Sequence, residues 1–195
     1  MSQQFYRERF NTPTGWMFLV TDPEQRLRAL EWEDKGDRMQ RLLRVYYAEK
    51  GYHLVKSPAH SRARLALEAY FEGELEAVAE LRTETRGTAL QRAVWSALRN
   101  IPAGTTLSYG QLAREIGNPT AVRAVGAANG ANPISVVVPC HRVIGADGSL
   151  TGYGGGLERK RWLLVHERTH ATSLSVAKRT TGAHAPKCEP SHGAH

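Results

Sequence analysis

The chain has 195 residues, of which 41% are hydrophobic and 23% are charged. This composition excludes a disordered chain and allows one large domain or two small ones, each with its own core. Two cysteines, Cys140 and Cys188, cannot build a disulfide framework, which indicates a reducing compartment. No apolar run approaches the roughly 20 residues of a membrane span, and the N-terminus lacks a signal-peptide core. We therefore expect a cytoplasmic protein with no membrane contact.

Positive charge is concentrated in the second half of the sequence. The net charge is +7, and residues 86–170 contain 10 Lys and Arg against 4 Asp and Glu, whereas residues 1–85 contain 13 against 14. A surplus confined to one half favours a polyanionic partner, with nucleic acid as the first candidate. A solvated basic face explains the charge equally well, so composition leaves both readings open.

The first 85 residues predict an α+β domain. Apolar stretches at residues 5–10, 16–20 and 27–32, separated by turn signals, predict a small antiparallel sheet. Apolar residues at helical spacing predict helices over residues 37–49 and 61–71. A charged, weakly periodic segment at residues 72–87 is the predicted linker, and no chemistry is evident in this half.

The second domain, residues 86–170, is predicted to be mostly helical. Thr88 with Gln91, and Ser108 with Gln111, have capping-box spacing and predict helices that end near residues 101 and 116. A glycine then precedes Asn118, a predicted N-cap, and a third helix over residues 119–130. Two short helices joined by a glycine turn predict a helix-turn-helix. A further amphipathic helix is expected over residues 157–168, and the polar residues 171–195 predict a disordered tail.

The predicted helix at residues 119–130 has the sequence PTAVRAVGAANG, in which Arg123 is the one long charged side chain. Such a smooth surface allows close approach to the DNA minor groove with an arginine projecting into the duplex. A buried helix that packs through its small residues has the same composition, so this pattern alone does not decide between the two.

The stretch VVVPCHRV places a cysteine and a histidine together. Residues 134–138 predict a buried strand that Pro139 ends, so Cys140 would lie just past a rigid element. A thiol needs a basic or cationic neighbour to become a thiolate, which His141, Arg142 or a distant residue could supply, His141 through a bridging water or a turned backbone. Glu167 is the candidate carboxylate that orients the imidazole. A buried, inert cysteine is the alternative, whereas metal ligation lacks further ligands nearby.

Four stretches together resemble one family, the O6-alkylguanine-DNA alkyltransferases, also called methylated-DNA-protein-cysteine methyltransferases. They are IPAGTTLSYGQLA (101–113), RAVGAANGANP (123–133), PCHRV (139–143) and GYGGGLERKRWLLVHE (152–167). The resemblance is to the constitutive bacterial type and implies an RNase H-like N-terminal domain. It also implies a monomer that binds double-stranded DNA through the minor groove, flips the damaged base, and irreversibly takes an alkyl group from O6 of guanine, or O4 of thymine.

The resemblance assigns roles to individual residues. Cys140 would accept the alkyl group, with His141 as its base through a water and Glu167 orienting that histidine. Arg123 would hold the place of the flipped nucleotide, and Tyr109 would support the flipped base as a candidate proton donor. The remaining DNA- or base-binding residues that it implies are Ala124, Gly126, Asn132, Val143, Tyr153 and Gly154.

The sequence departs from the family pattern in three respects, one of which is that residues 171–195 extend beyond the family's usual end. The GYGGG segment and Asn129 change pocket-lining positions, so the accepted alkyl size is not determined. The N-terminal half lacks the Cys and His set with which some relatives hold zinc, and we expect neither a metal nor a cofactor.

Three rival functions remain at the level of sequence. Alkyltransferase-like proteins bind the same lesions, but they lack the acceptor cysteine. A cysteine hydrolase built on Cys140, His141 and Glu167 would leave the smooth helix unexplained. A DNA-binding regulator would use Cys140 only as a structural residue.

Overall fold

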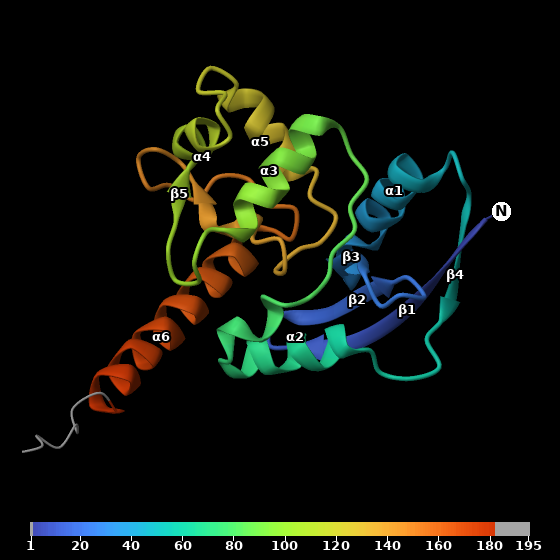
Figure 1. Ribbon diagram of the computed structural model, residues 1–195, viewed down its shortest axis with the longest axis horizontal. Helices are drawn as coiled ribbons and strands as arrows, with labels where there is room; N and C mark the ends of the chain where they lie inside the picture. The colour runs from blue at the N-terminus through green and yellow to red at the C-terminus, as the bar shows by residue number, and fades with distance from the viewer. Residues whose placement is uncertain (1, 182–195) are drawn as a thin grey trace, which may run out of the picture.

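A computed structural model describes residues 2–181, with side chains through residue 171. The fold is α+β, with a sheet and its helices in the first half and a mostly helical second half beside them (Figure 1). The last helix begins in the second half, and its C-terminal part projects away from both halves (Figure 1). In the part of the chain that the structure describes, none of the helices has the length and apolar character that crossing a membrane requires.

The sheet contains the three predicted strands, β1 (Gln3–Thr12), β2 (Gly15–Thr21) and β3 (Leu27–Trp32), paired antiparallel. The prediction of a purely antiparallel sheet is wrong, because β4 (Tyr52–Lys56) lies beside β1 in parallel and gives the order β3-β2-β1-β4. This edge strand has no buried residue, so it lacks the alternation that marks a half-buried strand in sequence. The RNase H-like description of this half stays a prediction.

Two helices flank this sheet, α1 (Gly36–Tyr47) and α2 (Arg62–Glu72), close to the predicted ranges. The Ser61 hydroxyl caps α2 by accepting from the Arg64 amide, and Gly73 ends it with a φ of 111°. The 3₁₀ turn η1 (Glu33–Lys35) connects β3 to α1, and a second 3₁₀ turn, η2 (Leu75–Val78), follows α2.

Both predicted capping boxes of the second half are confirmed. Thr88 and Gln91 begin α3 (Ala89–Arg99), and Ser108 and Gln111 begin α4 (Tyr109–Glu115), each by reciprocal hydrogen bonds. A two-residue strand, β5 (Leu107–Ser108), precedes α4 and pairs in parallel with β6 (Val143–Ile144).

The next helix differs from its prediction at the N-terminus. Gly117, with a φ of 71°, ends the α4 segment as expected, but α5 (Val122–Gly130) starts three residues later than Pro119. The predicted cap on Asn118 is wrong, because its carbonyl instead accepts from the Ala121 amide in a turn before the helix. DNA binding by α4 and α5 as a helix-turn-helix stays a prediction.

The predicted strand over residues 134–138 is also wrong. Only Ile134 makes a bridge, to Leu30 at the edge of the sheet, and the following residues form a turn in which Val136 has a φ of 68°. These residues are buried, so their hydrophobic pattern resembles a strand although the backbone turns. Cys140 therefore lies on the 3₁₀ turn η3 (Cys140–Arg142), directly after this buried turn.

The last helix, α6 (Leu157–Thr181), runs past the predicted end at Arg168. Residues 182–195 of the predicted tail, including Cys188, lie outside the described residues.

One hydrophobic core joins the two halves. It contains Phe10, Trp32 and Leu67 from the first half and Trp95 and Leu163 from the second. A second, smaller cluster lies between the sheet and α1. The predicted domain boundary at residue 86 therefore does not separate two independent hydrophobic cores.

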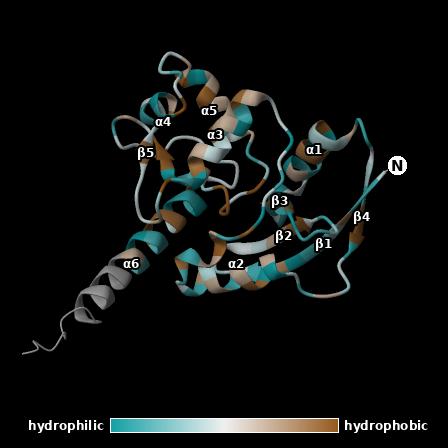
Figure 2. Cartoon of the chain, in the orientation of Figure 1, coloured by the Kyte–Doolittle hydropathy of each residue, from teal (hydrophilic) through white to brown (hydrophobic). Residues whose placement is uncertain are grey.

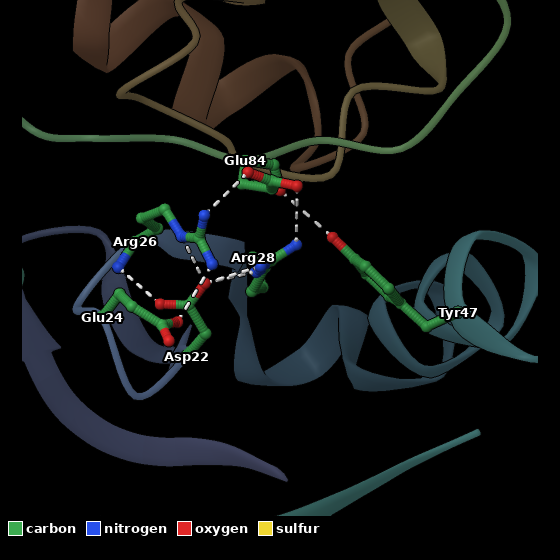
Figure 3. A network of polar contacts seen from close by, with 6 residues as sticks. All are labelled: Asp22, Glu24, Arg26, Arg28, Tyr47 and Glu84. Atoms are coloured by element: carbon green, nitrogen blue, oxygen red, sulfur yellow. Dashed lines mark hydrogen bonds and ion pairs between the residues drawn. The ribbon is translucent and has the colours of Figure 1, made fainter. Parts of the chain in front are cut away.

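Ion pairs attach the predicted linker to the sheet (Figure 3). Buried Asp22 accepts from the guanidinium groups of Arg26 and Arg28 at 2.6–2.9 Å, and Glu84 of the linker pairs with both arginines. Tyr47 of α1 donates to the Glu84 carbonyl at 3.1 Å. The arginines thus link the turn before β3 to the segment that enters the second half.

We expect Asp22→Asn to lower the free energy of unfolding by about 3 kcal/mol, because the buried Arg28 guanidinium loses its buried carboxylate partner at 2.6 Å and keeps only Glu84, partly exposed and 3.5 Å away. Urea unfolding measures the change. Glu33→Gln, which breaks the exposed pair with Arg9, is the control and should leave the midpoint almost unchanged. Equal effects of the two substitutions would contradict this reading of the network.

Candidate active site

The backbone around Cys140 is held by the side chain of Asn132. This residue is fully buried after α5, and its amide nitrogen donates to the Val138 carbonyl at 2.8 Å and to Cys140 Sγ at 3.1 Å. Its side-chain oxygen accepts from the Ile134 amide at 3.0 Å. Asn132 thus supplies the hydrogen bonds that a neighbouring strand would otherwise give to this buried turn.

Cys140 is buried, with 5% of the residue exposed. Burial raises its pKa, and the hydrogen bond from Asn132 and the positive charge of Arg38 only partly offset this effect. The resting cysteine is therefore a protonated thiol, which needs a base before it can act as a nucleophile.

His141 and Glu167 lie together as the sequence predicts. His141 Nε2 lies 2.8 Å from Glu167 Oε1, and both side chains are fully buried. Burial lowers the pKa of His141 despite the nearby carboxylate, so the ring is neutral, with its hydrogen on Nε2 directed at Glu167. Nδ1 is then the basic nitrogen, and it has no hydrogen-bond partner among the described residues.

The Glu167 carboxylate receives several further hydrogen bonds. Arg142 donates through Nη2 and Nε at 2.8 and 2.9 Å, Tyr70 donates its hydroxyl at 2.7 Å, and the Gly104 amide donates at 3.2 Å. Although burial alone would raise it, the interactions with His141 and Arg142 hold the pKa of Glu167 well below its ordinary range. Glu167 is thus a permanent anion that does not take the proton of His141.

The predicted DNA-contacting residues lie on and beside α5. Arg123 and Ala124 are exposed, and Arg123 has no hydrogen-bond or ion-pair partner among the described residues. Tyr109 opens α4, its hydroxyl accepts from Thr151 at 3.2 Å, and its ring faces Gly126 of α5. The helix α5 contains few hydrophilic residues (Figure 2). Arg123 and Ala124 are therefore open to solvent, whereas Tyr109 and Gly126 pack together where α4 meets α5.

The predicted pocket residues surround η3. Val143 is buried, and its carbonyl accepts from Lys160 Nζ at 2.6 Å. The Cys140 carbonyl accepts from buried Asn129 at 3.4 Å. Tyr153 packs edge-on against Trp32 and lies 6.3 Å from the His141 ring, centroid to centroid. The Val143 amide also donates to the Cys140 carbonyl at the end of η3, so both lone pairs of that oxygen are engaged, the one facing Asn129 by a long contact.

Lys160 and Arg38 are site residues that the sequence analysis missed. Fully buried Lys160 also donates to the Thr151 carbonyl at 2.9 Å, and burial lowers its pKa to about 8. Arg38 of α1 pairs with buried Glu31 and donates to the Gly130 and Asn132 carbonyls at 2.6 and 3.1 Å. It also packs on Gly154, where a Cβ would lie 2.7 Å from the guanidinium carbon. No local pattern marks these residues, because their partners are distant in sequence.

Comparison with known proteins identifies relatives across nearly the whole chain. The model of the 6-O-methylguanine DNA methyltransferase DNA-binding domain matches residues 89–169. The methylated-DNA–protein-cysteine methyltransferase of Salmonella typhimurium is 54% identical over 160 residues, which cover 82% of this chain and 94% of that protein. The protein of that name from Haemophilus influenzae is 53% identical over 164 residues, covering 84% and 86%.

Solved structures agree with these relatives. The O6-methylguanine methyltransferase of Mycobacterium tuberculosis superposes with a TM-score of 0.71 at 39% identity, covering 89% of this chain and 99% of that one. The OGT of the same organism in complex with DNA gives 0.69 at 40% identity, covering 86% and 94%. The fold and these relatives define a DNA-binding transferase of DNA repair. The chain belongs to the methylated-DNA–protein-cysteine methyltransferase family.

The low pKa of Glu167 has a consequence for stability. A carboxylate whose folded pKa lies below its ordinary value of 4.5 stabilises the fold above that pH, and its contribution is lost as the pH falls toward the folded pKa. We expect Glu167→Gln to cost about 3–5 kcal/mol at neutral pH, because Arg142 loses a buried partner. The difference from wild type should shrink below pH ~4.5 in urea titrations.

Glu158→Gln is the matched control for this titration. Glu158 lies on the same helix, but its side chain is 90% exposed and, within the described part of the chain, pairs only with Arg161. Its substitution should leave the free energy of unfolding unchanged across the same pH range. A Glu167→Gln penalty that is constant with pH would contradict the assignment of a buried anion.

Proposed function

We propose that the protein repairs alkylated duplex DNA by a single irreversible transfer of an alkyl group to Cys140. The Cys140 sulfur attacks the alkyl carbon on O6 of guanine, a sulfur–carbon bond forms, and the carbon–oxygen bond breaks. The electron pair of that bond passes to the guanine, which takes up one proton. The product thioether has no leaving group that water can displace, so each chain acts once. O4-alkylthymine, with the same alkyl–oxygen arrangement, is the second proposed substrate.

The observation that carries this proposal is the buried set of Cys140, His141 and Glu167. Glu167 fixes His141 with its hydrogen on Nε2 and leaves the basic Nδ1 free, which suits removal of the thiol proton through one water. Because burial raises the pKa of Cys140, the reactive thiolate forms only when the base is engaged. Such a thiol is protected from oxidation until substrate arrives.

The DNA-binding part of the proposal uses α4 and α5 as a helix-turn-helix that lies in the minor groove. A base inside a duplex is out of reach of a buried thiol, so the damaged nucleotide must be flipped out. Exposed Arg123, which has no protein partner among the described residues, is suited to enter the stack in its place. Ala124 and Gly126 allow the backbone to approach the groove closely, and Tyr109 lies beside them to support the flipped base. One lesion engages one chain, so we propose a monomer.

Pocket residues complete the proposed site. The carbonyls of Cys140 and Val143 would accept from the guanine amino group, and Tyr153 and Gly154 would line the pocket beside the alkylated oxygen. Asn132 would hold the turn between α5 and the acceptor sulfur, which its 3.1 Å contact with Sγ supports.

The first test is the intact mass of the protein after incubation with a duplex that carries O6-methylguanine. We expect wild type to gain the mass of one methyl group and no more, and Cys140→Ala to gain none while it keeps its affinity for the lesion. Lesion binding without a mass change in wild type would indicate a damage sensor. A wild-type protein that neither binds the lesion nor gains mass would favour the hydrolase interpretation.

Arg123→Ala tests base flipping. We expect its single-turnover transfer rate on a paired lesion to fall by at least about tenfold, because unstacking a base costs a few kcal/mol and the arginine no longer fills the gap. The deficit should shrink when the lesion lies opposite an abasic site, where extrusion costs less. A deficit of equal size on both duplexes would contradict the assigned role and indicate a plain phosphate contact.

A further inference from the structure

Tyr70 connects the N-terminal half directly to the proposed active site. It lies on α2, is fully buried, and donates its hydroxyl to Glu167 Oε1 at 2.7 Å. Its backbone carbonyl lies 2.8 Å from Nε2 of His166, the neighbour of Glu167 on α6. The side chain and the backbone of one residue therefore fix two consecutive residues of α6.

The Tyr70 hydroxyl shares its acceptor atom with the proposed base. Oε1 accepts from Tyr70, from Arg142 Nη2 and from His141 Nε2, all at 2.7–2.8 Å. Oε2 accepts from Arg142 Nε and the Gly104 amide. Each donor withdraws part of the negative charge that the carboxylate offers to the others. The hydroxyl therefore competes with His141 for the same oxygen.

We propose that Tyr70 is a positioning residue for the transfer reaction, which holds Glu167 Oε1 and sets how strongly that oxygen pulls on His141. This inference rests on the proposed function, because it assigns His141 as the base. Tyr70 touches neither substrate nor sulfur in this role. It acts through Glu167, and thereby keeps the imidazole neutral and basic at Nδ1.

Several groups face His141 directly, whereas Tyr70 reaches it only through Glu167. Glu167 and Lys160 approach from α6, Arg142 and Cys140 from η3, and Tyr153 from the loop before α6. Arg142 cannot be removed cleanly, because it balances the buried carboxylate and also donates to the Ile101 carbonyl. Tyr70 is neutral, so Tyr70→Phe removes one hydrogen bond while every charge and the backbone contact to His166 remain.

The direction of the effect follows from this competition. Without the hydroxyl, Oε1 offers more charge to His141 and stabilises the protonated ring, which raises the pKa of His141. A base must be neutral to accept a proton, so the acidic limb of the rate profile should move to higher pH.

The experiment measures the single-turnover rate of methyl transfer from an O6-methylguanine duplex to the full chain as a function of pH. We expect Tyr70→Phe to transfer the methyl group and to move the acidic midpoint upward by about 0.5–1 pH unit, with unchanged lesion affinity. Tyr47→Phe is the matched control, because Tyr47 is equally buried and donates its hydroxyl to the Glu84 carbonyl, away from the site. Its midpoint should equal that of wild type.

A second variant covers the case in which Tyr70→Phe does not fold. Tyr70→3-fluorotyrosine, installed at this codon, keeps the hydroxyl and makes it a stronger donor, so the midpoint should move in the opposite direction, to lower pH. A midpoint that matches wild type in every folded variant would overturn the inference and leave Tyr70 as a packing residue. So would a wild-type profile with no acidic limb. Failure of the wild type to take up any methyl group would instead overturn the proposed function.

Discussion

The Glu167 carboxylate is the interaction on which the arrangement of the site depends. It is fully buried on α6 and binds four residues from three other segments: Tyr70 from α2, the Gly104 amide after α3, and His141 and Arg142 from η3. A buried anion is costly unless its lone pairs are occupied, so each of these donors is needed for the others to be stable where they are. One carboxylate thus fixes both the fold around η3 and the tautomer of the histidine beside Cys140.

The cysteine itself is held by neutral groups. Asn132 contacts the sulfur and the carbonyl of the preceding turn, and Leu30 of β3 exchanges backbone hydrogen bonds with Pro133 and Ser135 at 3.0 and 2.9 Å. These bonds attach the turn to the open edge of the sheet. The sulfur is therefore positioned by these hydrogen bonds, while His141, its proposed base, is held separately by Glu167. This separation allows a thiol with a raised pKa to stay unreactive while the sulfur keeps a fixed position.

Local signals in the sequence predicted what depends on neighbours along the chain. The capping boxes at Thr88 and Ser108, the Gly117 terminator and the first three strands are confirmed, because each rests on hydrogen bonds or alternation within a few residues. The edge strand β4 and the turn over residues 134–138 were mispredicted. The first lacks a buried face, and the second is apolar because it is buried from all sides. The closeness of His141 and Glu167 could be inferred from residue chemistry, whereas Arg38 and Tyr70 are brought to the site only by the packing of the two halves.

That packing gives the N-terminal half a role that its sequence does not reveal. Arg38 fixes the C-terminal end of α5 and packs on Gly154, Leu30 anchors the turn before Cys140, and Tyr70 reaches Glu167. These three contacts come from α1, β3 and α2, so every layer of the first half reaches the site. They surround a core that both halves share, and the ion pairs around Glu84 hold the connecting segment against the sheet. The second half carries the acceptor and the proposed DNA-binding helices, but the first half constrains its geometry, so the catalytic unit is the two halves together.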